Sequence, residues 1–373
     1  MLVSKSDNNL DLIRGLAAVL VCTGHLRAAM FPMVTQASEA GRPLARLFLL
    51  LMAQGHNAVM VFFVLSGYLV GGSVLRSRQF EWKRYLINRL SRLWVVLVPA
   101  LLFTWLIVGI LIGKHPEYLA GSFEAHWHSW PGPFAFTPQV FLANIFFLQT
   151  ICSPVFGHNG PLWSLAYEFW YYLIFPALFV SIKGRDKAIN VCLGALSLLA
   201  LLALPTPVAN GFLVWLMGAA AAWLQQRKAL FVKVPSWVWL PCLLLFLVFT
   251  KADKLFWPGR NLAWLQDLGL GLGFAGVLWA LVVNKPKLFP YWFNSIGHGL
   301  SAMSYSLYCT HFPLVLLIGA QFYGSMNATI NRSTLAAFAC WALLLLLNGG
   351  LFWLLFERHT SRVREAAASA WLG

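Results

Sequence analysis

Charged side chains are scarce in this chain: only 10% of its 373 residues are Asp, Glu, Lys or Arg, whereas 60% are hydrophobic. A soluble domain carries about 25% charged residues, so this composition excludes a water-soluble fold. Apolar runs of membrane-spanning length recur from one end of the chain to the other. Because the core of a bilayer accepts only segments that satisfy their own backbone hydrogen bonds, we expect an all-α polytopic membrane protein embedded in lipid.

Acidic residues are especially few: 12 Asp and Glu stand against 27 Lys and Arg, which gives a net charge of +15. The basic residues are spread over short segments between apolar runs, and the cytoplasmic loops of membrane proteins normally collect them. The excess therefore indicates membrane topology, and we expect no nucleic-acid partner. The six cysteines lack C-x-x-C spacing, so we expect neither a disulfide framework nor a metal site.

The apolar runs predict about ten transmembrane helices. They cover residues 9–30, 46–73, 90–112, 161–182, 188–205, 210–225, 235–250, 262–283, 300–321 and 334–356. The weaker stretch 139–151, about 13 residues long, suits a short re-entrant or interfacial segment. With this arrangement and a cytoplasmic N-terminus, most Lys and Arg fall on the cytoplasmic side, and the C-terminus falls there as well. We expect a single membrane domain over residues 1–373.

The longest predicted non-spanning region, about 113–160, then lies outside the cytoplasm. It contains several histidines and tryptophans, namely His115, His126, Trp127, His128 and Trp130. A long loop of this composition suits a lid or a surface for an acceptor molecule. The tryptophans also fit an ordinary interfacial aromatic belt, and both interpretations stay open.

Arg14 and His25 lie inside the first predicted span, where ionisable groups are costly to bury and therefore indicate function. Eleven residues at about 100° each make three turns plus about 20°, so both side chains project from one helix face. His25 is a candidate general base, because an imidazole titrates near neutrality and can take a proton from an attacking hydroxyl. The alternative is a histidine that only hydrogen-bonds to a neighbouring helix.

Arg89 and Arg92 stand three residues apart at the cytoplasmic start of the third predicted span and therefore share a helix face. Two guanidinium groups there can hold a phosphorylated ligand through bidentate hydrogen bonds. Basic residues also anchor cytoplasmic helix ends, and spacing alone does not separate the two interpretations.

Glu168 falls about two turns into the predicted span 161–182, in an aromatic segment that also holds Trp163. A carboxylate at that depth needs a partner and indicates either a functional group or a buried ion pair that fixes helix packing. Trp163 is a candidate for lining a polar cavity in the same region.

Tyr305, Tyr308 and His311 follow one another at helical spacing in the ninth predicted span and share a face. They can line a polar cavity, and Ser66, in the glycine-rich segment 55–72, is a further candidate for such a lining. Interhelical hydrogen bonding and close helix packing explain the same residues as well.

Taken together, these stretches resemble the acyltransferase-3 family of integral membrane acyltransferases over nearly the whole chain. The segments that carry the resemblance are Leu10-Asp11-Leu12-Ile13-Arg14-Gly15 with His25, Phe62-Phe63-Val64-Leu65-Ser66-Gly67-Tyr68, Arg89 with Arg92, Trp163-Ser164-Leu165 with Glu168, Ser304-Tyr305-Ser306-Leu307-Tyr308 with His311 and Pro313, and Glu357-Arg358. Each motif is weakly specific by itself, and their shared order along the chain makes the match specific.

The resemblance implies transfer of an acyl group, usually acetyl from cytoplasmic acetyl-CoA, to a hydroxyl of a carbohydrate or lipid-linked glycan. It also implies a bacterial inner-membrane protein of the O-acetyltransferase type that needs no metal. Carried over by position, His25 is the catalytic histidine and Arg14 its paired cation. Arg89 and Arg92 receive the phosphates of CoA, and Glu168 is the family's acidic position.

The chain departs from the family pattern at two positions. Met60 stands where many relatives have an acid, which puts a role for an acid on that helix in doubt. His359 stands where many relatives have proline after Glu-Arg. Some relatives also carry a fused extracytoplasmic SGNH-type esterase domain, and we expect none in this chain.

Several questions stay open from the sequence. Acyl transfer needs a donor that stabilises the developing oxyanion, for which Tyr305 and Tyr308 are candidates. Direct transfer and an acyl-His25 intermediate are both compatible with the motifs. The main rival is a proton-coupled transporter or flippase of a glycan or small molecule, with Arg14, His25 and Glu168 as a relay. No inverted repeat is evident, which weakens this rival, and acyl-CoA hydrolysis separates the two classes.

Overall fold

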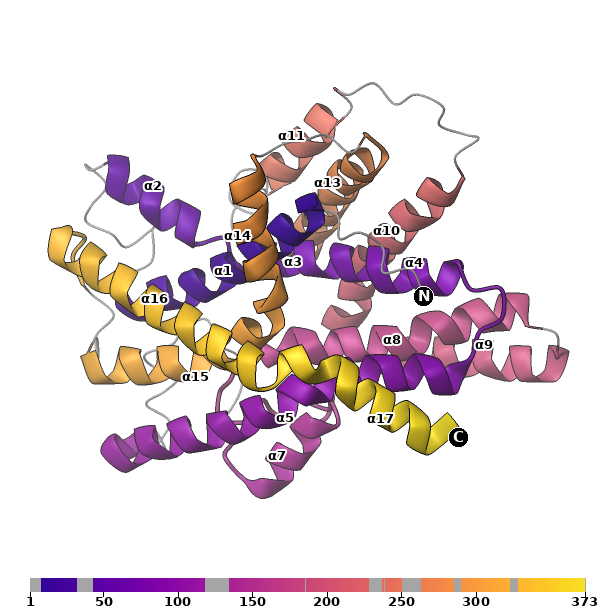
Figure 1. Ribbon diagram of the computed structural model, residues 1–373, viewed down its shortest axis with the longest axis horizontal. Helices are drawn as coiled ribbons and strands as arrows, with labels where there is room; N and C mark the ends of the chain where they lie inside the picture. The colour runs from indigo at the N-terminus through magenta and orange to yellow at the C-terminus, as the bar shows by residue number, and fades with distance from the viewer. Residues whose placement is uncertain are drawn as a thin grey trace. The chain divides into compact units, whose positions relative to one another are not determined.

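The computed structural model describes residues 8–31, 43–117, 134–184, 186–227, 237, 239–249, 263–284, 290–322 and 328–372 (Figure 1). Within these ranges the regular secondary structure is helical, and the only β-type pairings are two isolated bridges. The predicted all-α polytopic membrane fold is confirmed.

Seven helices in the described part of the chain are long and apolar enough to cross a membrane, or eight if one bent pair counts as a span. They are α1 (Asn8–Met30), the run Pro43–Leu75 that contains α2 to α4, α5 (Trp82–Lys114), α8 (Leu162–Lys183), α10 (Thr206–Gln226), α13 (Ala263–Asn284) and the run Arg332–Leu372 that contains α16 and α17; the bent pair is Phe293–Ala302 with Ser304–Phe322. Within the described residues the number of spans is therefore lower than the predicted number of about ten.

Two of the predicted spans are helices that are too short. α9 (Lys187–Ala203) has 17 residues and α11 (Trp239–Phe249) has 11. At 1.5 Å per residue they measure about 26 Å and about 17 Å, less than the roughly 30 Å of a hydrocarbon core. Hydropathy registers the apolar character of these stretches but not the length of the helix described within each, so the predicted number of spans exceeds the number in the described residues.

The stretch 139–151 is helical only in α7 (Pro138–Ile145), which has 8 residues and is about 12 Å long. This length agrees with a short segment that does not cross the bilayer. Turns follow it up to the start of α8. The centre of the predicted loop 113–160, with His126, Trp127, His128 and Trp130, lies outside the described residues.

The chain divides into two compact units. The first comprises Met1–His56, Lys83–Ser164 and Tyr291–Gly373, and the second comprises Asn57–Trp82 and Leu165–Pro290. In the first unit, α1 packs against four helices: α2 (Pro43–Met52), α14 (Tyr291–Ala302), α15 (Ser304–Phe322) and α16 (Arg332–Leu355). Figure 1 shows α16 in yellow, followed by α17 (Thr360–Leu372) after the short 3-10 turn η6 (Glu357–His359).

Small residues allow the helices of the first unit to approach closely. A Cβ on Gly15 would lie 2.6 Å from the Cβ of Leu300, and one on Gly349 would lie 2.9 Å from the Cβ of Leu307. Neither distance is sterically possible unless the neighbouring atoms move. The contact between α1 and α14 therefore requires glycine at position 15, and the contact between α16 and α15 requires glycine at position 349.

The second unit uses glycine in the same way. The π-helix η2 (Gly67–Gly71) and the short α4 (Gly72–Leu75) continue α3 (Gly55–Ser66) and pack against α10, which in turn packs against α13. A Cβ on Gly67 would collide with the Trp215 carbonyl, and one on Gly218 would collide with the Val64 carbonyl. The glycine-rich segment therefore serves close helix packing.

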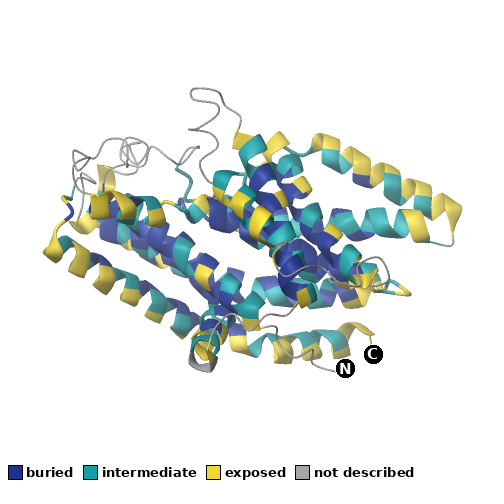
Figure 2. Ribbon diagram, turned by 90° about the horizontal axis from the view of Figure 1, so that it is seen from above, coloured by how far each residue is buried: buried dark blue, intermediate teal, exposed yellow. Residues whose placement is uncertain are grey.

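Apolar side chains also cover the outer faces of helices. On α16, Leu343, Leu347 and Leu351 are 56%, 65% and 50% exposed and recur every fourth residue on one face. Figure 2 shows buried residues in dark blue where helices face one another and exposed ones in yellow on the opposite faces. An exposed leucine face of this kind suits contact with lipid.

Candidate active site on α1 and α15

His25 lies on α1 at a close crossing with the chain between α2 and α3. A Cβ on the preceding residue, Gly24, would lie 3.0 Å from the Met52 carbonyl oxygen and 3.5 Å from the Cα of Gly55. Arg14 lies on the same unbroken helix, and both side chains are half-buried. α1 thus carries the predicted cation and imidazole into the first compact unit.

The imidazole of His25 contacts the imidazole of His311 on α15. His25 Nδ1 lies 3.0 Å from His311 Nε2, and the two rings are 24° from parallel with centroids 5.2 Å apart. His311 is fully buried, whereas His25 is half-buried. The ring of Phe312 packs edge-on against His25 at 5.0 Å. The structure therefore joins two histidines that the sequence treats as separate candidates.

His311 is held by its own helix as well. Its Nδ1 lies 2.9 Å from the carbonyl oxygen of Leu307, one turn earlier on α15. The two nitrogens of His311 are thus both engaged, one by backbone and one by His25. The Leu307 carbonyl, His311 and His25 thus form a hydrogen-bonded line, and of the four ring nitrogens only Nε2 of His25 lies outside it. The imidazole of His25 is half-buried, and through this nitrogen it can accept a proton or attack a carbonyl.

The hydroxyls of Tyr305 and Tyr308 donate to backbone carbonyls. Tyr305 donates to the carbonyl of Leu93 on α5 at 3.0 Å. Tyr308 donates to the carbonyl of Pro161 at 2.9 Å, and its oxygen lies 2.5 Å from Ser164 Oγ. Since a phenol has one proton to give, this geometry favours interhelical anchoring over an oxyanion-stabilising role for both tyrosines.

Asn159, which was not among the residues singled out from the sequence, also anchors α15. Pro313 has no N–H and so cannot bond to the Cys309 carbonyl, which lies four residues earlier. Asn159, which is fully buried, donates through Nδ2 to that carbonyl at 3.0 Å and to Thr104 Oγ1 at 3.0 Å. The proline inside the predicted span was the available signal, because a freed carbonyl at membrane depth needs a donor from elsewhere.

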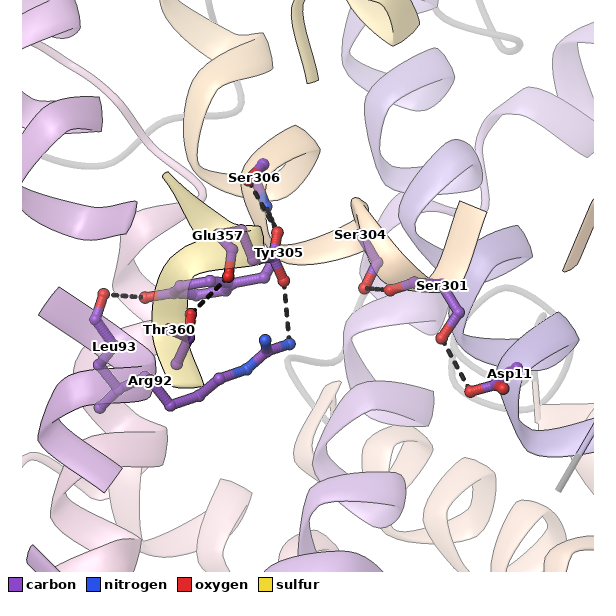
Figure 3. A network of polar contacts seen from close by, with 9 residues as sticks. All are labelled: Asp11, Arg92, Leu93, Ser301, Ser304, Tyr305, Ser306, Glu357 and Thr360. Atoms are coloured by element: carbon purple, nitrogen blue, oxygen red, sulfur yellow. Dashed lines mark hydrogen bonds and ion pairs between the residues drawn. The ribbon is translucent and has the colours of Figure 1, made fainter. Parts of the chain in front are cut away.

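Arg92 and Glu357 form an ion pair, with Arg92 Nη2 3.0 Å from Glu357 Oε1 (Figure 3). The other carboxylate oxygen accepts the backbone N–H of Ser306 at 3.0 Å and its Oγ–H at 2.7 Å. Ser306 lies in the first turn of α15, where N–H groups have no partner within the helix. The guanidinium of Arg92 also lies over the ring of Tyr305, 5.7 Å from its centroid.

Arg89 is one turn earlier on α5 and is half-buried. Its guanidinium lies 5.8 Å from the ring centroid of Tyr85. Both predicted phosphate ligands therefore lie over a tyrosine ring, and Arg92 in addition pairs with the buried carboxylate of Glu357. The sequence did not anticipate this difference.

Asp11 links α1 to α14. Its Oδ1 accepts a hydrogen bond from Ser301 Oγ at 3.0 Å, and its Oδ2 lies 3.2 Å from His298 Nδ1 (Figure 3 shows the contact with Ser301). The acid of the Leu10–Gly15 motif thus fixes the start of the helix that carries Arg14 and His25.

Trp163 and His56 form an aromatic pair in the first unit. Their rings are 18° from parallel with centroids 6.4 Å apart. Trp163 precedes the serine that contacts Tyr308, and His56 follows the glycine that approaches Gly24. His56 is exposed and Trp163 half-buried, so part of this aromatic surface is accessible near the helices that carry the two histidines.

Glu168 and Ser66 belong to the second unit and join one hydrogen-bonded chain. Tyr172 donates to Glu168 Oε1 at 2.5 Å, and its oxygen lies 3.2 Å from Ser66 Oγ. Ser66 Oγ in turn accepts the indole N–H of Trp215 at 3.1 Å. The carboxylate predicted to need a partner thus has one in a tyrosine hydroxyl.

Comparison with known proteins agrees with these motifs. A family model described as an acyltransferase domain matches residues 7–353. A curated protein named O-acetyl transferase, from Shigella phage Sf6, is 27% identical over 198 residues, which are 52% of this chain and 52% of that protein. The chain thus spans about half the length of this relative, and no solved structure matches it significantly. Because the family model covers nearly the whole chain, including every candidate residue from Arg14 to His311, the chain belongs to the acyltransferase-3 family.

Proposed function

We propose that this protein is a membrane O-acyltransferase that moves an acyl group, acetyl in the simplest case, from cytoplasmic acyl-CoA to a hydroxyl of a carbohydrate or lipid-linked glycan. The observation that carries the proposal is the pair formed by His25 and His311, 3.0 Å apart on two packed helices. Family membership and the name of the phage relative support the reaction class.

The chemistry requires a base and a leaving group. His25 takes the proton of the acceptor hydroxyl as its oxygen attacks the thioester carbonyl. The bond between carbon and sulfur breaks, CoA leaves as a thiolate, and protonated His25 returns the proton to sulfur. In the two-step version His25 attacks the thioester first and passes the acyl group on. Both versions need a lone pair on the accessible nitrogen of His25.

The donor and the acceptor need different surfaces. For the donor, Arg89 and Arg92 offer guanidinium groups to the phosphates of CoA, with Arg14 as a further cation on the helix of His25. For the acceptor, the accessible rings of Trp163 and His56 offer a flat surface to the apolar face of a sugar.

Glu168 and Ser66 enter the proposal on the family's acidic position and on their shared hydrogen bonds with Tyr172. Glu168→Gln keeps an acceptor for Tyr172 and removes the charge. If the charge is used in catalysis, this variant loses turnover while its melting temperature is kept. If the residue only fixes packing, Glu168→Gln keeps its turnover and Glu168→Ala melts earlier.

The proposed orientation puts both termini in the cytoplasm and the segment 113–160 on the other side of a bacterial inner membrane. It rests on the distribution of Lys and Arg. Reporter fusions at each terminus test it directly, since a reporter active only outside the cytoplasm should stay inactive at both ends.

The first experiment is binding and slow hydrolysis of acetyl-CoA by the detergent-purified protein. Wild type should release free CoA, His25→Ala should not, and His115→Ala, which removes an imidazole just after the end of α5 in the same unit, should behave as wild type. If acetyl-CoA binds but no free CoA is released, the reaction requires the acceptor, and the next test is a screen of glycan acceptors. Failure to bind any acyl-CoA would contradict the proposal and favour a transporter.

A further inference from the structure

We infer that His311 is a positioning residue that holds His25 in the tautomer with its proton on Nδ1 and its lone pair on Nε2. The catalytic consequence rests on the proposed function, whereas the tautomer itself follows from the hydrogen bonds. Three groups carry the argument: the Leu307 carbonyl, His311 and His25.

His311 is hydrogen-bonded to its own helix. Nδ1 of His311 lies 2.9 Å from the carbonyl oxygen of Leu307. A carbonyl oxygen can only accept a hydrogen bond, so the proton must be on Nδ1 of His311. In the neutral ring, Nε2 is then an acceptor.

The protonation of His311 determines which nitrogen of His25 carries the proton. Nε2 of His311 faces Nδ1 of His25 at 3.0 Å, and two acceptors cannot share one hydrogen bond. His25 must therefore donate from Nδ1. Its second nitrogen, Nε2, carries the lone pair in the neutral ring and lies outside the hydrogen-bonded line.

The opposite arrangement needs a charged His311 that donates from both nitrogens. His311 is fully buried, and the two groups that contact its ring nitrogens, a neutral carbonyl and another imidazole, bring no negative charge. An unpaired ion in that position is strongly disfavoured relative to the neutral ring. The neutral donor–acceptor line is therefore the stable one.

This line has a consequence for reactivity. A histidine free in water prefers its proton on Nε2, which would leave the accessible nitrogen of His25 without a lone pair. His311 reverses that preference. The same hydrogen bond also persists when His25 becomes protonated, because Nδ1 donates in both states, so the pair needs no rearrangement during proton transfer.

The experiment reads the tautomer and the rate separately. Protein labelled with 15N-histidine is measured by NMR, with His25 assigned by its absence in His25→Ala. Wild type should show Nδ1 of His25 protonated and Nε2 bare. His311→Leu removes the acceptor on α15 and leaves His25 its contact with the Val21 carbonyl of its own helix, so His25 should shift towards Nε2–H. His311→Gln, whose amide oxygen can accept, should keep more of the Nδ1–H form.

Turnover of acyl-CoA should follow the tautomer. His311→Leu should lower kcat about 10- to 100-fold, the loss typical when the hydrogen-bond partner of a metal-bound histidine is removed, with the KM for acyl-CoA unchanged. His311→Gln should recover part of the rate. Thr310→Val is the matched control, because it removes a buried hydroxyl from the same turn of α15 whose hydrogen bonds go to the Ser306 carbonyl and Asn348.

The outcomes separate the two hypotheses. A wild-type His25 protonated on Nε2 would overturn the positioning role even if the enzyme is active. If His25 has the expected tautomer but the protein never consumes acyl-CoA, the result supports the positioning role of His311 and contradicts the proposed function. Equal loss of kcat in His311→Leu, His311→Gln and Thr310→Val, with one tautomer throughout, would reduce His311 to a packing residue.

Discussion

The ion pair between Arg92 and Glu357 ties α5 to the turn after α16, and the same carboxylate holds the first turn of α15 through Ser306. The Glu357 side chain is 1% exposed and that of Arg92 41%. A residue expected to bind CoA phosphates therefore also takes part in anchoring the helix that carries His311.

Glu357→Ala should destabilise the protein. The substitution leaves the buried N–H and hydroxyl of Ser306 without an acceptor, and each buried unsatisfied group costs about 1–3 kcal/mol. The thermal unfolding midpoint in detergent should fall, while Glu365→Ala, at an exposed position on α17, should leave it unchanged. An unchanged midpoint for Glu357→Ala would mean that water replaces the carboxylate at no cost.

Arg89 and Arg92 should separate by function. Arg92→Ala should lower the unfolding midpoint, because it leaves a buried carboxylate without its cation. Arg89→Ala should raise the KM for acyl-CoA with a smaller change in the midpoint, since the ring that its guanidinium lies over, that of Tyr85, belongs to its own helix. Arg84→Ala, an exposed residue one turn further back, serves as the control for general loss of positive charge. Identical effects of Arg89→Ala and Arg84→Ala would make Arg89 a topology anchor.

The sequence predicted local features well. Composition alone gave the all-α membrane class, and helical spacing gave one unbroken helix carrying Arg14 and His25. It predicted more spans than the described residues contain, because hydropathy does not report how long the helices α9 and α11 are. These successes and this difference share a cause, since periodicity reports only what happens within one helix.

Contacts between helices were beyond the sequence. His25 and His311 are 286 positions apart, and Arg92 meets Glu357 from another helix. Their chemistry made them candidates, but no spacing rule pairs residues so far apart. Asn159 is the intermediate case. Pro313 in the sequence predicts that the carbonyl four residues earlier lacks its helical hydrogen bond, but it does not predict which residue donates to that carbonyl.

Asn159 and Pro313 should be energetically coupled. Asn159→Ala removes the hydrogen bond that Asn159 donates to the Cys309 carbonyl and should cost about 1–3 kcal/mol of stability. Pro313→Ala restores an N–H that can reach the same carbonyl, so Asn159→Ala should cost less in that background. A double-mutant cycle on unfolding midpoints measures the coupling. Additive effects would show that Asn159 acts through Thr104 instead.

Trp163 should govern affinity for the acceptor and leave the donor unaffected. Its indole, paired with His56, is partly accessible, and loss of aromatic stacking costs about 0.5–1.5 kcal/mol. Trp163→Ala should therefore raise the KM for the glycan acceptor about 2- to 10-fold, while hydrolysis of acyl-CoA without acceptor stays at the wild-type rate. Trp163→Phe keeps a ring and should restore most of the affinity, and Trp371→Ala, 69% exposed near the end of α17, should have no effect. A loss of acyl-CoA hydrolysis in Trp163→Ala equal to its loss of transfer would instead assign the tryptophan to the packing around Ser164 and Tyr308.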